Sequence, residues 1–553
     1  MSNFEQKIFD ALREAVRAVY DIEADESLLV VETPKDPKLG DYATSTAMKL
    51  ARTLHKNPFE IAEAIAEKLR ELLPEAESIT VARPGFINFR LKNTALSSLI
   101  NQVIEAGDSY GRNESGKGKK VLVEWVSANP TGELHCGHAR NAAWGDSICR
   151  LMEASGWDVL REYYVNDAGN QIVMLGKSLE ARYFEHFGRD DHPLPEDGYH
   201  AEDVKRIAEE IAEKDGDKWL TADPKERLDY FMTEGKTREL KKIDRDLKLY
   251  GVEIQSWMHE TFFYENDRAR IRACLDRMAE MGLTYEKDGA LWFKSTDYGD
   301  EKDRVLRKSD GTLSYLTPDI ANHVHKVERG YPFLVDLWGA DHHSYVTRMQ
   351  AALTALGYPA GTLAVDLIQM VRMVEDGKEV KMSKRTGNAI TIRELCDDIG
   401  VDAARWFFAS KDVSTHMDLD LKLARSKDNN NPVYYAQYAH SRMCSILSNP
   451  KTPAFHTQDS YERLTDEKEL QLLKSIGEFP SEVANDALLR KPNKLADYIL
   501  SLVKVFHSYY NSCKVINPDD PELTNERLGL VKATMITLKN ALFLIGVSAP
   551  ESM

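Results

Sequence analysis

Hydrophobic residues at helical spacing open the chain. Between residues 4 and 20, and again between 58 and 73, apolar positions recur every three or four residues, which predicts two amphipathic helices. The following stretch SITVARPGFINFRL alternates like a pair of strands. A polar run rich in glycine and serine, GDSYGRNESGKGKK, comes next and is typical of a linker. We therefore expect residues 1–112 to form a small N-terminal α+β module.

A compact apolar run begins the second region. Residues 121–126, VLVEWV, predict a buried parallel strand, and SANPTGELHCGH then leads into a helix that starts near His138. A strand, a glycine-bearing loop and a helix form the opening unit of a nucleotide-binding α/β sheet. Strand-like segments return at TLSYLT, PFLVDLWGAD and LAVDLIQMVRMV. We expect a Rossmann-type α/β domain over residues 113–390, with a strongly charged helical insertion at about residues 173–300.

The pattern of apolar residues after residue 430 predicts helices to the end of the chain. Four long amphipathic segments, separated by turns with Pro and Asn, follow residue 430. This pattern predicts a helical bundle over residues 430–553. Residues 391–429 would then be a connecting segment that carries the end of the catalytic core.

Composition narrows the class of protein. The 553 residues include 42% hydrophobic and 29% charged residues, a globular balance. Six scattered cysteines without a C-x-x-C pair favour reduced thiols and no zinc site. The chain starts without a signal-like segment and has no apolar stretch of 18 residues, so we expect a cytoplasmic location.

The most informative motif is His135-Cys136-Gly137-His138, directly after a predicted strand and at the start of a helix. Amides at the helix N-terminus and imidazole N–H groups can face a phosphate chain, and glycine allows its close approach. This geometry suits nucleotidyl transfer. The alternatives for an isolated H-x-x-H are a metal pair or two unrelated surface histidines.

A second motif is Lys381-Met382-Ser383-Lys384 in a glycine-flanked loop. Two ammonium groups with a hydroxyl between them can follow a triphosphate as pyrophosphate leaves. Alone, the motif could be an ordinary lysine-rich surface loop. Combined with the histidine motif, in this order along one α/β domain, it indicates a site that binds the phosphates of a nucleotide.

Acidic residues in unusual places indicate a cationic substrate. Glu124 lies inside an otherwise apolar strand, and Ser127 and Asn129 follow where parallel sheets bind their ligands. Asp319 comes four residues after Tyr315, one turn on if this segment is helical. Two carboxylates around one pocket suit a planar guanidinium, which binds them in a bidentate manner. A helix cap or a solvated acid is the alternative.

These motifs resemble class I aminoacyl-tRNA synthetases, in which the HIGH signature corresponds to residues 135–138 and the KMSKS signature to 381–385. Cys136 replaces the family's Ile and Arg385 its last Ser. The segments VEWVSANPTGELHCGH, REYYVNDAGNQI, SYLTPDIA, WGADHHSYVTRM and NPVYYAQYAHSR are similar to the arginyl-tRNA synthetase family, as are LGDYATSTAMKLA and RPGFINFRL near the start.

The resemblance implies roles for individual residues. It implies catalytic roles for His135, His138, Lys381 and Lys384; ATP binding by His135, Gly137, His138, Gly339, Asp341, Lys381, Ser383 and Lys384; and arginine binding by Glu124, Ser127, Asn129, Tyr315, Asp319 and His342. It further implies an N-terminal module that contacts the tRNA elbow, an anticodon-binding helical domain and a monomer.

The implied reaction is the attachment of L-arginine to tRNA(Arg) through an arginyl-adenylate, with ATP as substrate, Mg²⁺ on its phosphates and no metal held by the protein. Three rivals are a small-molecule adenylyltransferase, a synthetase for another amino acid and a non-catalytic tRNA-binding relative. A small-molecule adenylyltransferase would not need the helical C-terminal region. The paired acids favour a cationic amino acid over others, and the intact signatures argue against a non-catalytic relative.

Some aromatic and histidine clusters allow two interpretations. Tyr435, Tyr438 and Arg442 share one helix face and could either stack on unpaired tRNA bases or pack. The pairs His323 with His325 and His342 with His343 could bind metal, but such pairs are common on helix surfaces. We expect the run Trp406, Phe407 and Phe408 to be core.

At first sight, the net charge of −17 argues against a nucleic-acid partner. However, residues 430–553 contain about 13 Lys and Arg against 14 Asp and Glu, so the predicted helical domain is nearly neutral. Because phosphate contacts are local, tRNA binding can rely on a few basic patches and on shape, with a modest dependence on salt.

Overall fold

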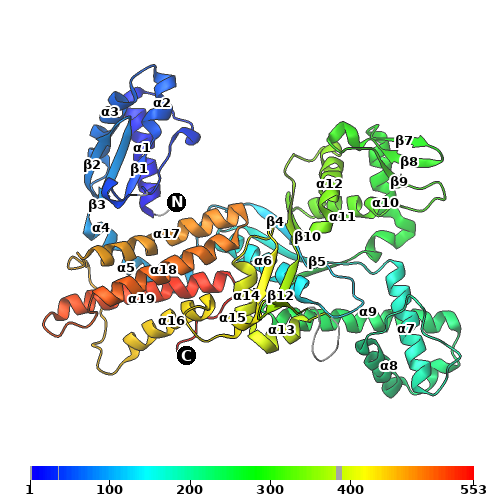
Figure 1. Cartoon of the computed structure of the whole chain (residues 1–553). Coiled ribbons are helices and arrows are strands. Elements are labelled where there is room, and N and C mark those ends of the chain that lie inside the picture. The colour runs from blue at the N-terminus through cyan, green and yellow to red at the C-terminus, as the bar shows by residue number, and fades with distance from the viewer. Residues whose placement is uncertain (1–2, 35, 381–388) are drawn as a thin grey trace.

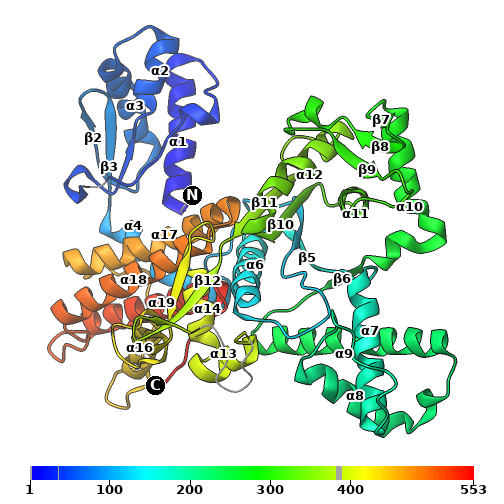
Figure 2. The same cartoon turned by 45° about the vertical axis from the view of Figure 1, so that its right-hand side comes forward.

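The computed structural model describes residues 3–34, 36–380 and 389–553 (Figure 1). It consists of an N-terminal module, a central α/β region and a C-terminal helical region, as predicted for the fold class. Figures 1 and 2 show the module standing above one end of the helical region, while two helical lobes extend from the other side of the central sheet.

The N-terminal module packs three helices against an antiparallel sheet of order β1-β3-β2. Its elements are α1 (Asn3–Tyr20), β1 (Tyr42–Thr44), α2 (Thr46–Leu54), α3 (Pro58–Leu72), β2 (Ala76–Ala82) and β3 (Phe86–Leu91). The two predicted helices and the predicted strand pair are confirmed. Helices α4 (Asn93–Ser97) and α5 (Leu99–Ala106) then lead to the central region.

The central sheet is five-stranded and parallel, with order β11-β10-β4-β5-β6. Its strands are β4 (Lys120–Glu124), β5 (Asp158–Val165), β6 (Ser256–His259), β10 (Phe333–Gly339) and β11 (Leu363–Ile368), and α6 (Cys136–Ala154) follows β4. From β4 the strand order runs outward in both directions, so the topological switch point lies between β4 and β10. Ligands bind at the carboxyl ends of the strands at such a point.

The charged stretch at about 173–300 is not one insertion, because β6 returns to the sheet in its middle. One lobe consists of α7 (Asn170–His186), α8 (Glu202–Asp215) and α9 (Pro224–Leu249); the other contains α10 (Thr261–Glu280), β7 (Thr284–Lys287), β8 (Ala290–Phe293), β9 (Arg304–Arg307), α11 (Leu316–Glu328) and α12 (His343–Ala355). The four residues of β6 are too few to show a strand pattern. The strand predicted at TLSYLT is wrong: α11 begins at Leu316, with Pro318 in its first turn, where proline is tolerated.

After the sheet, a smaller β-structure and three helices complete the central region. They are β12 (Val371–Glu375), β13 (Lys378–Glu379), α13 (Ile392–Ile399), α14 (Val401–Ala409), β14 (Met417–Asp420) and α15 (Leu421–Arg425). Trp406, Phe407 and Phe408 on α14 are buried, which confirms that they belong to the core.

The C-terminal region is the predicted bundle of four long helices: α16 (Pro432–Ser448), α17 (Glu467–Leu489), α18 (Pro492–Ser512) and α19 (Pro521–Leu544). All except α17 begin with a proline at the first helical position, where its missing N–H costs nothing. In the described part of the chain, no helix combines the length and apolarity that a membrane span requires.

A buried charge cluster fastens α19 to α6, the helix that carries the histidine motif at its start. Asp146 on α6 accepts hydrogen bonds from Arg405 (2.6 Å), Arg150 (2.6 Å) and Arg161 (2.5 Å). Arg405 also donates to the carbonyl of Ile545, just past the end of α19. Burial disfavours the Asp146 charge, but the three guanidinium groups outweigh it and hold the pKa of the carboxyl at about 2.

We expect Asp146→Asn to lower the midpoint of thermal unfolding by several degrees. Removing the carboxylate leaves buried guanidinium groups without their anion, and breaking a buried ion pair in this way costs ~3–5 kcal/mol. Calorimetry of the full chain measures the effect. As a control, Asp376→Asn removes one exposed partner of Lys422 and should leave the midpoint unchanged. An equal midpoint for the two variants would contradict the role of the cluster.

Candidate functional site

The two histidines of the motif form the N-terminal cap of α6. The backbone N–H of Gly137 donates to Nδ1 of His135 (3.1 Å), and the backbone N–H of His135 donates to Nδ1 of His138 (3.2 Å). The two rings are stacked, with centroids 3.8 Å apart. Because each Nδ1 accepts a hydrogen bond, each neutral ring carries its proton on Nε2 and can donate it to a ligand.

Burial keeps both rings neutral. It lowers the pKa of His135, and it lowers the pKa of His138 to about 3, with a further contribution from His135. At neutral pH the pair therefore provides two uncharged N–H donors beside the positive end of a helix dipole. This arrangement can stabilise negative charge that develops on a phosphate.

The segment that follows the lysine motif is paired with the histidine motif. The N–H of Cys136 donates to the carbonyl of Ile390 (3.0 Å), and the N–H of Ile392 donates to that of Leu134 (2.8 Å). Lys381, Ser383 and Lys384 themselves lie outside the described residues. On the other side of that gap, Val380 is bonded to Met373 on β12. The chain that follows the lysine motif thus runs directly beside the histidine motif.

Arg140, one turn into α6, holds two loops against the site. Its guanidinium donates to the carbonyls of Gln369 (2.8 Å), Asp412 (2.8 Å) and Thr415 (3.0 Å). Gln369 lines the cavity beside the histidines, and so does His416 next to Thr415. The residue is fully buried, which makes it a structural link between α6 and the opposite rim.

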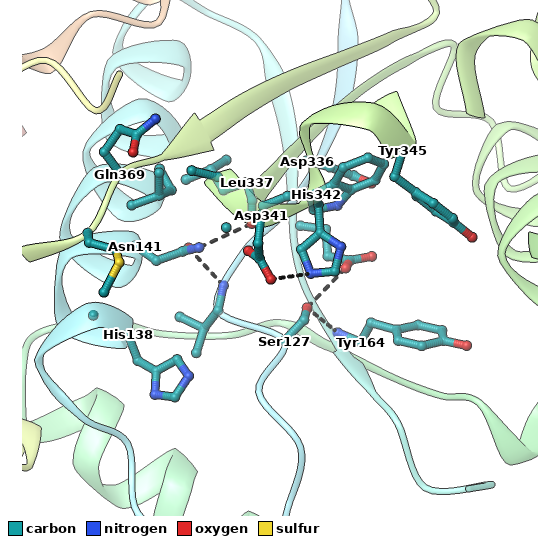
Figure 3. A pocket seen from close by; sticks show the side chains of 18 of the residues that line it. Ser127, His138, Asn141, Tyr164, Asp336, Leu337, Asp341, His342, Tyr345 and Gln369 are labelled. Carbon is teal, nitrogen blue, oxygen red and sulfur yellow. Dashed lines mark hydrogen bonds and ion pairs between the residues drawn. The ribbon is translucent and has the colours of Figure 1, made fainter. Parts of the chain in front are cut away.

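A cavity of about 1010 Å³ opens at the switch point and collects most of the predicted site residues. Those that line it are Glu124, Ser127, His135, Gly137, His138, Asp319, Gly339, Asp341 and His342. Figure 3 shows His138 on α6 across from Asp341 and His342, which follow β10. Asn129 and Tyr315 do not line the cavity, and Tyr315 is 89% exposed.

The floor of the cavity is a buried charge network. Glu124 on β4 and Asp336 on β10 are in register on neighbouring parallel strands, so both side chains emerge on the same face. Lys326 donates to Glu124 (2.6 Å) and to Asp336 (3.1 Å), and His323 is bonded to Asp336 (2.8 Å). Ser127 donates to the other oxygen of Glu124 at 3.0 Å.

Acidic side chains outnumber basic side chains in and beside this network. Burial alone would lower the pKa of Lys326, but the carboxylates of Asp336 and Glu124 outweigh it and hold the pKa above its usual value. Asp319 adds a third carboxylate, bonded to the hydroxyl of Tyr345 (2.5 Å). Three acidic side chains therefore lie around one buried ammonium. Burial raises the pKa of Glu124 and of Asp319, so a cationic ligand would favour their ionised forms.

Glu260, at the start of α10, extends the acidic group. Burial raises the pKa of its carboxyl to about 7, and the charge of Asp319 adds to the shift. Burial raises the pKa of Asp319 as well. Glu260 does not itself line the cavity but interacts electrostatically with Asp319, which does. A carboxyl with a pKa near neutrality is a candidate for a functional role.

Several residues of the site were not predicted from the sequence. They are Asn141, Tyr164, Glu260, Asn322, Lys326, Asp336, Tyr345, Gln369, Met370 and His416. Asp336 could have been found in the same way as Glu124, because it too is an acidic residue inside an apolar strand sequence. Lys326 lies seven residues after Asp319, two turns along one face of α11. His323 was considered only as a metal ligand, and among the described residues no group of three or more His, Cys, Asp or Glu could hold a metal ion.

Two of the three predicted tRNA-contacting residues lie at a second cavity of about 770 Å³ on the helical region. Arg442 donates to the hydroxyls of Tyr438 (3.0 Å) and Tyr510 (3.3 Å), and its guanidinium stacks over the ring of Tyr510. Tyr438 and Arg442 line this cavity. Tyr435 instead packs against His507, with ring centroids 5.1 Å apart.

Three family models match the chain and together cover nearly all of it. The model described as "tRNA synthetases class I (R), catalytic domain" matches residues 99–443. The "Arginyl tRNA synthetase N terminal domain" matches residues 3–91, and the "DALR anticodon binding domain" matches residues 436–553.

Curated relatives and solved structures agree with these models. The chain is 48% identical to an "Arginine--tRNA ligase" of Bacillus subtilis over 100% of both chains, and 48% identical to one of Oceanobacillus iheyensis over 99% of both. A putative arginyl-tRNA synthetase structure from Campylobacter jejuni is 34% identical, with a TM-score of 0.77, and covers 84% of this chain and 100% of its own. The arginyl-tRNA synthetase of Thermus thermophilus, 22% identical over 99% of this chain and 100% of its own, shares the fold with a TM-score of 0.77.

Proposed function

The chain belongs to the arginyl-tRNA synthetase family, and from this premise we propose that the cavity at the switch point is where its reaction takes place. The reaction attaches arginine to tRNA in two steps. The arginine carboxylate attacks the α-phosphate of ATP, giving arginyl-adenylate and pyrophosphate. The terminal ribose hydroxyl of tRNA(Arg) then attacks the acyl carbon and releases AMP.

Arginine would bind with its guanidinium at the acidic end of the cavity. The observation that carries this placement is the charge imbalance, three carboxylates against one buried ammonium. Asp319 is the main anionic contact, and Glu124, held by Ser127 and Lys326, supplies the second charge. His342 lines the same cavity and would border the arginine. The arginine contacts of Asn129 and Tyr315 stay predictions.

ATP would lie along the start of α6. Nε2 of His135 and Nε2 of His138 can donate to its phosphate oxygens, and Gly137 leaves room for the chain to approach the backbone. Gly339 and Asp341, on the opposite wall, would hold the nucleoside. Catalysis then relies on positioning and charge stabilisation, without a covalent enzyme intermediate.

The lysine segment would complete the phosphate site. Lys381, Ser383 and Lys384 lie outside the described residues, but the segment that follows them is hydrogen-bonded to the histidine motif at Leu134 and Cys136. Two ammonium groups there can neutralise the departing pyrophosphate. ATP is proposed to enter as its Mg²⁺ complex, in which the ion shields the phosphate charge. No zinc takes part in this account.

The helical region would bind tRNA(Arg) at the cavity that Tyr438 and Arg442 line. A phenol and a guanidinium stacked on Tyr510 offer flat surfaces for an unpaired base. Tyr435 packs within the region and would support this surface from below. Monomeric state and cytoplasmic location stay predictions.

A small-molecule adenylyltransferase is the rival that the site alone would allow. Such an enzyme could use the same histidine motif, but it would be indifferent to tRNA. Transfer of radiolabelled arginine to total tRNA by the full chain separates the two, since only a synthetase forms an acid-precipitable product. Adenylate formation without any transfer would favour the rival.

Arginine binding should depend on pH through Glu260. Its carboxyl must be ionised to favour a bound cation, and its pKa is about 7, so affinity rises as pH increases through neutrality. For one such group the KM for arginine should fall by up to about tenfold between pH 6 and pH 8. Arginine remains a cation throughout this range.

The Glu260→Gln variant tests the assignment, because an amide cannot titrate. We expect its KM for arginine to be high and nearly constant from pH 6 to pH 8, while the KM for ATP follows that of the unchanged enzyme. Glu286→Gln, at an exposed ion pair with Arg307, is a matched control that should keep the normal profile. A pH dependence that persists in Glu260→Gln would exclude this residue as its source.

A further inference from the structure

Two buried polar atoms at the acidic end of the cavity have no hydrogen-bond partner among the described residues. They are Oδ1 of Asn322 and the hydroxyl of Tyr164, and both residues line the cavity. Asn322 is only 3% exposed. A buried polar atom without a hydrogen-bond partner destabilises the folded protein, so proteins retain few of them. A pair in one binding cavity suggests that a ligand supplies the missing partners.

Both atoms adjoin the carboxylates proposed for arginine. Asn322 follows Asp319 by three residues on α11, so the two side chains lie on the same face of the helix. Tyr164 lies on β5, where its backbone N–H donates to the Oγ of Ser127, which in turn donates to Glu124. In Figure 3 the side chains of Tyr164 and Tyr345 run in the same direction, and Tyr345 is the residue that binds Asp319.

The ionisation state of Tyr164 suits a neutral contact. Burial raises the pKa of its hydroxyl well above the usual value, and the nearby charges of Glu260, Asp319 and Glu124 raise it further. The phenol therefore keeps its proton. It can donate that proton to one of these carboxylates while its oxygen accepts a hydrogen bond from a ligand.

Part of the hydrogen-bonding capacity of the carboxylates is already used by the protein. A guanidinium carries five N–H donors in one plane. Both oxygens of Glu124 already accept hydrogen bonds, from Ser127 and Lys326, and Oδ2 of Asp319 accepts one from Tyr345. Additional neutral acceptors around the plane would satisfy the remaining donors without adding further charge.

We propose that Asn322 and Tyr164 are specificity-determining residues that accept hydrogen bonds from the guanidinium group of arginine. The inference rests on the proposed arginine pocket. The ureido group of citrulline has a carbonyl oxygen where arginine has an N–H group, so an acceptor of the protein would face another acceptor. The ammonium of lysine is too compact to reach all these oxygens at once. A site built from buried acceptors rejects ligands that leave them unpaired.

Variants that remove only the acceptor test the proposal. Asn322→Leu keeps the approximate size of the side chain, and Tyr164→Phe removes one oxygen. ATP–pyrophosphate exchange by the full chain, with saturating tRNA, gives the KM for arginine and for ATP. We expect each variant to raise the KM for arginine about tenfold, since a hydrogen bond to a charged group is worth ~1.5–3 kcal/mol. The KM for ATP should remain within twofold.

Citrulline and a conservative variant give readouts that misfolding would not produce. Citrulline serves as a competitive inhibitor of arginine-dependent exchange. Each acceptor variant should lower the ratio of the citrulline inhibition constant to the KM for arginine by about tenfold. Asn322→Asp keeps an oxygen in place and should hold the KM for arginine at or below its normal value. Tyr285→Phe, whose hydroxyl binds Asp303 in the β7–β9 sheet, is the matched control and should change neither KM.

The outcomes separate this inference from the proposed function. If Asp319→Asn raises the KM for arginine but Asn322→Leu and Tyr164→Phe leave it unchanged, the pocket is correct and these two residues are not specificity determinants. If Asp319→Asn also has no effect, the proposed pocket is wrong. A parallel rise of both KM values in the acceptor variants would overturn the proposal, because it would indicate a general disturbance of the cavity.

Discussion

The Asp319→Asn variant should raise the KM for arginine about a hundredfold while the KM for ATP stays within twofold. The amide has the shape of the carboxylate but lacks its charge. Among the described residues, Asp319 forms no direct ion pair with a basic side chain, although the charges of His323 and Lys326 act on it from a distance, so the guanidinium of arginine is its natural counter-ion. Loss of one charge-assisted contact in a desolvated pocket costs ~2–5 kcal/mol, and about 1.4 kcal/mol corresponds to a factor of ten.

Steady-state pyrophosphate exchange measures both KM values. Arginine is varied at fixed ATP to obtain the KM for arginine, and ATP is varied at fixed arginine to obtain the KM for ATP. Asp297→Asn is the matched control, because this exposed carboxyl lies in the same lobe and should affect neither constant. An unchanged KM for arginine in Asp319→Asn would remove the acidic end of the cavity from the arginine site. Glu124 is less suitable for this test, because its loss would also leave the buried ammonium of Lys326 without one of its partners.

The His138→Ala variant should slow adenylate formation by a factor of 10² to 10³, the usual cost of removing a preorganised donor from a transition state. Nε2 of His138 carries the proton because Nδ1 is occupied by the backbone N–H of His135. Arginine binding lies at the other end of the cavity and should change little. The measurement is a single-turnover assay of adenylate formation with excess enzyme.

Two comparisons make the His138 result specific. His138→Gln retains an N–H donor of similar reach and should recover part of the rate. The pKa of His138 is about 3, so its removal should not change the shape of the rate profile between pH 6 and pH 8. If removal of His138 abolished a titration near neutrality, or if the rate were unchanged, the neutral-donor role would be wrong.

The sequence predicted the parts of the molecule that have strong local patterns. VLVEWV predicted β4, the histidine motif predicted the start of α6, and the proline-initiated segments predicted the bundle. Glu124 was identifiable because a carboxylate inside an apolar strand needs a partner. The same reasoning applied to Asp336 in PFLVDLWGAD would have found the second acid of the network.

Other parts depend on contacts distant in sequence and left no local pattern. Lys326 meets Glu124 across 202 positions, and only the register of β4 with β10 brings Asp336 to the same ammonium. Strand β6 has four residues, too few for a period to be visible. Gln369 and His416 reach the cavity because Arg140 holds their loops. No sequence motif predicts this role of Arg140.

The cavity also explains why net charge was a poor guide to function. An excess of 17 negative charges over the chain says little about a tRNA partner, because some of these charges lie in the cavity that we propose for a cationic substrate. Glu124, Asp319 and Asp336 alone contribute three carboxylates to one cavity. The salt dependence of tRNA binding should accordingly be modest and should reflect a few basic positions in the helical region.

The most direct test of the central claim is ATP–pyrophosphate exchange with each of the twenty amino acids, with and without total tRNA. The acidic cavity predicts exchange with arginine and with no other amino acid, lysine included, because only a planar guanidinium can meet the acids and the neutral acceptors together. Exchange supported by another amino acid, at a rate comparable to or above that with arginine, would contradict the account.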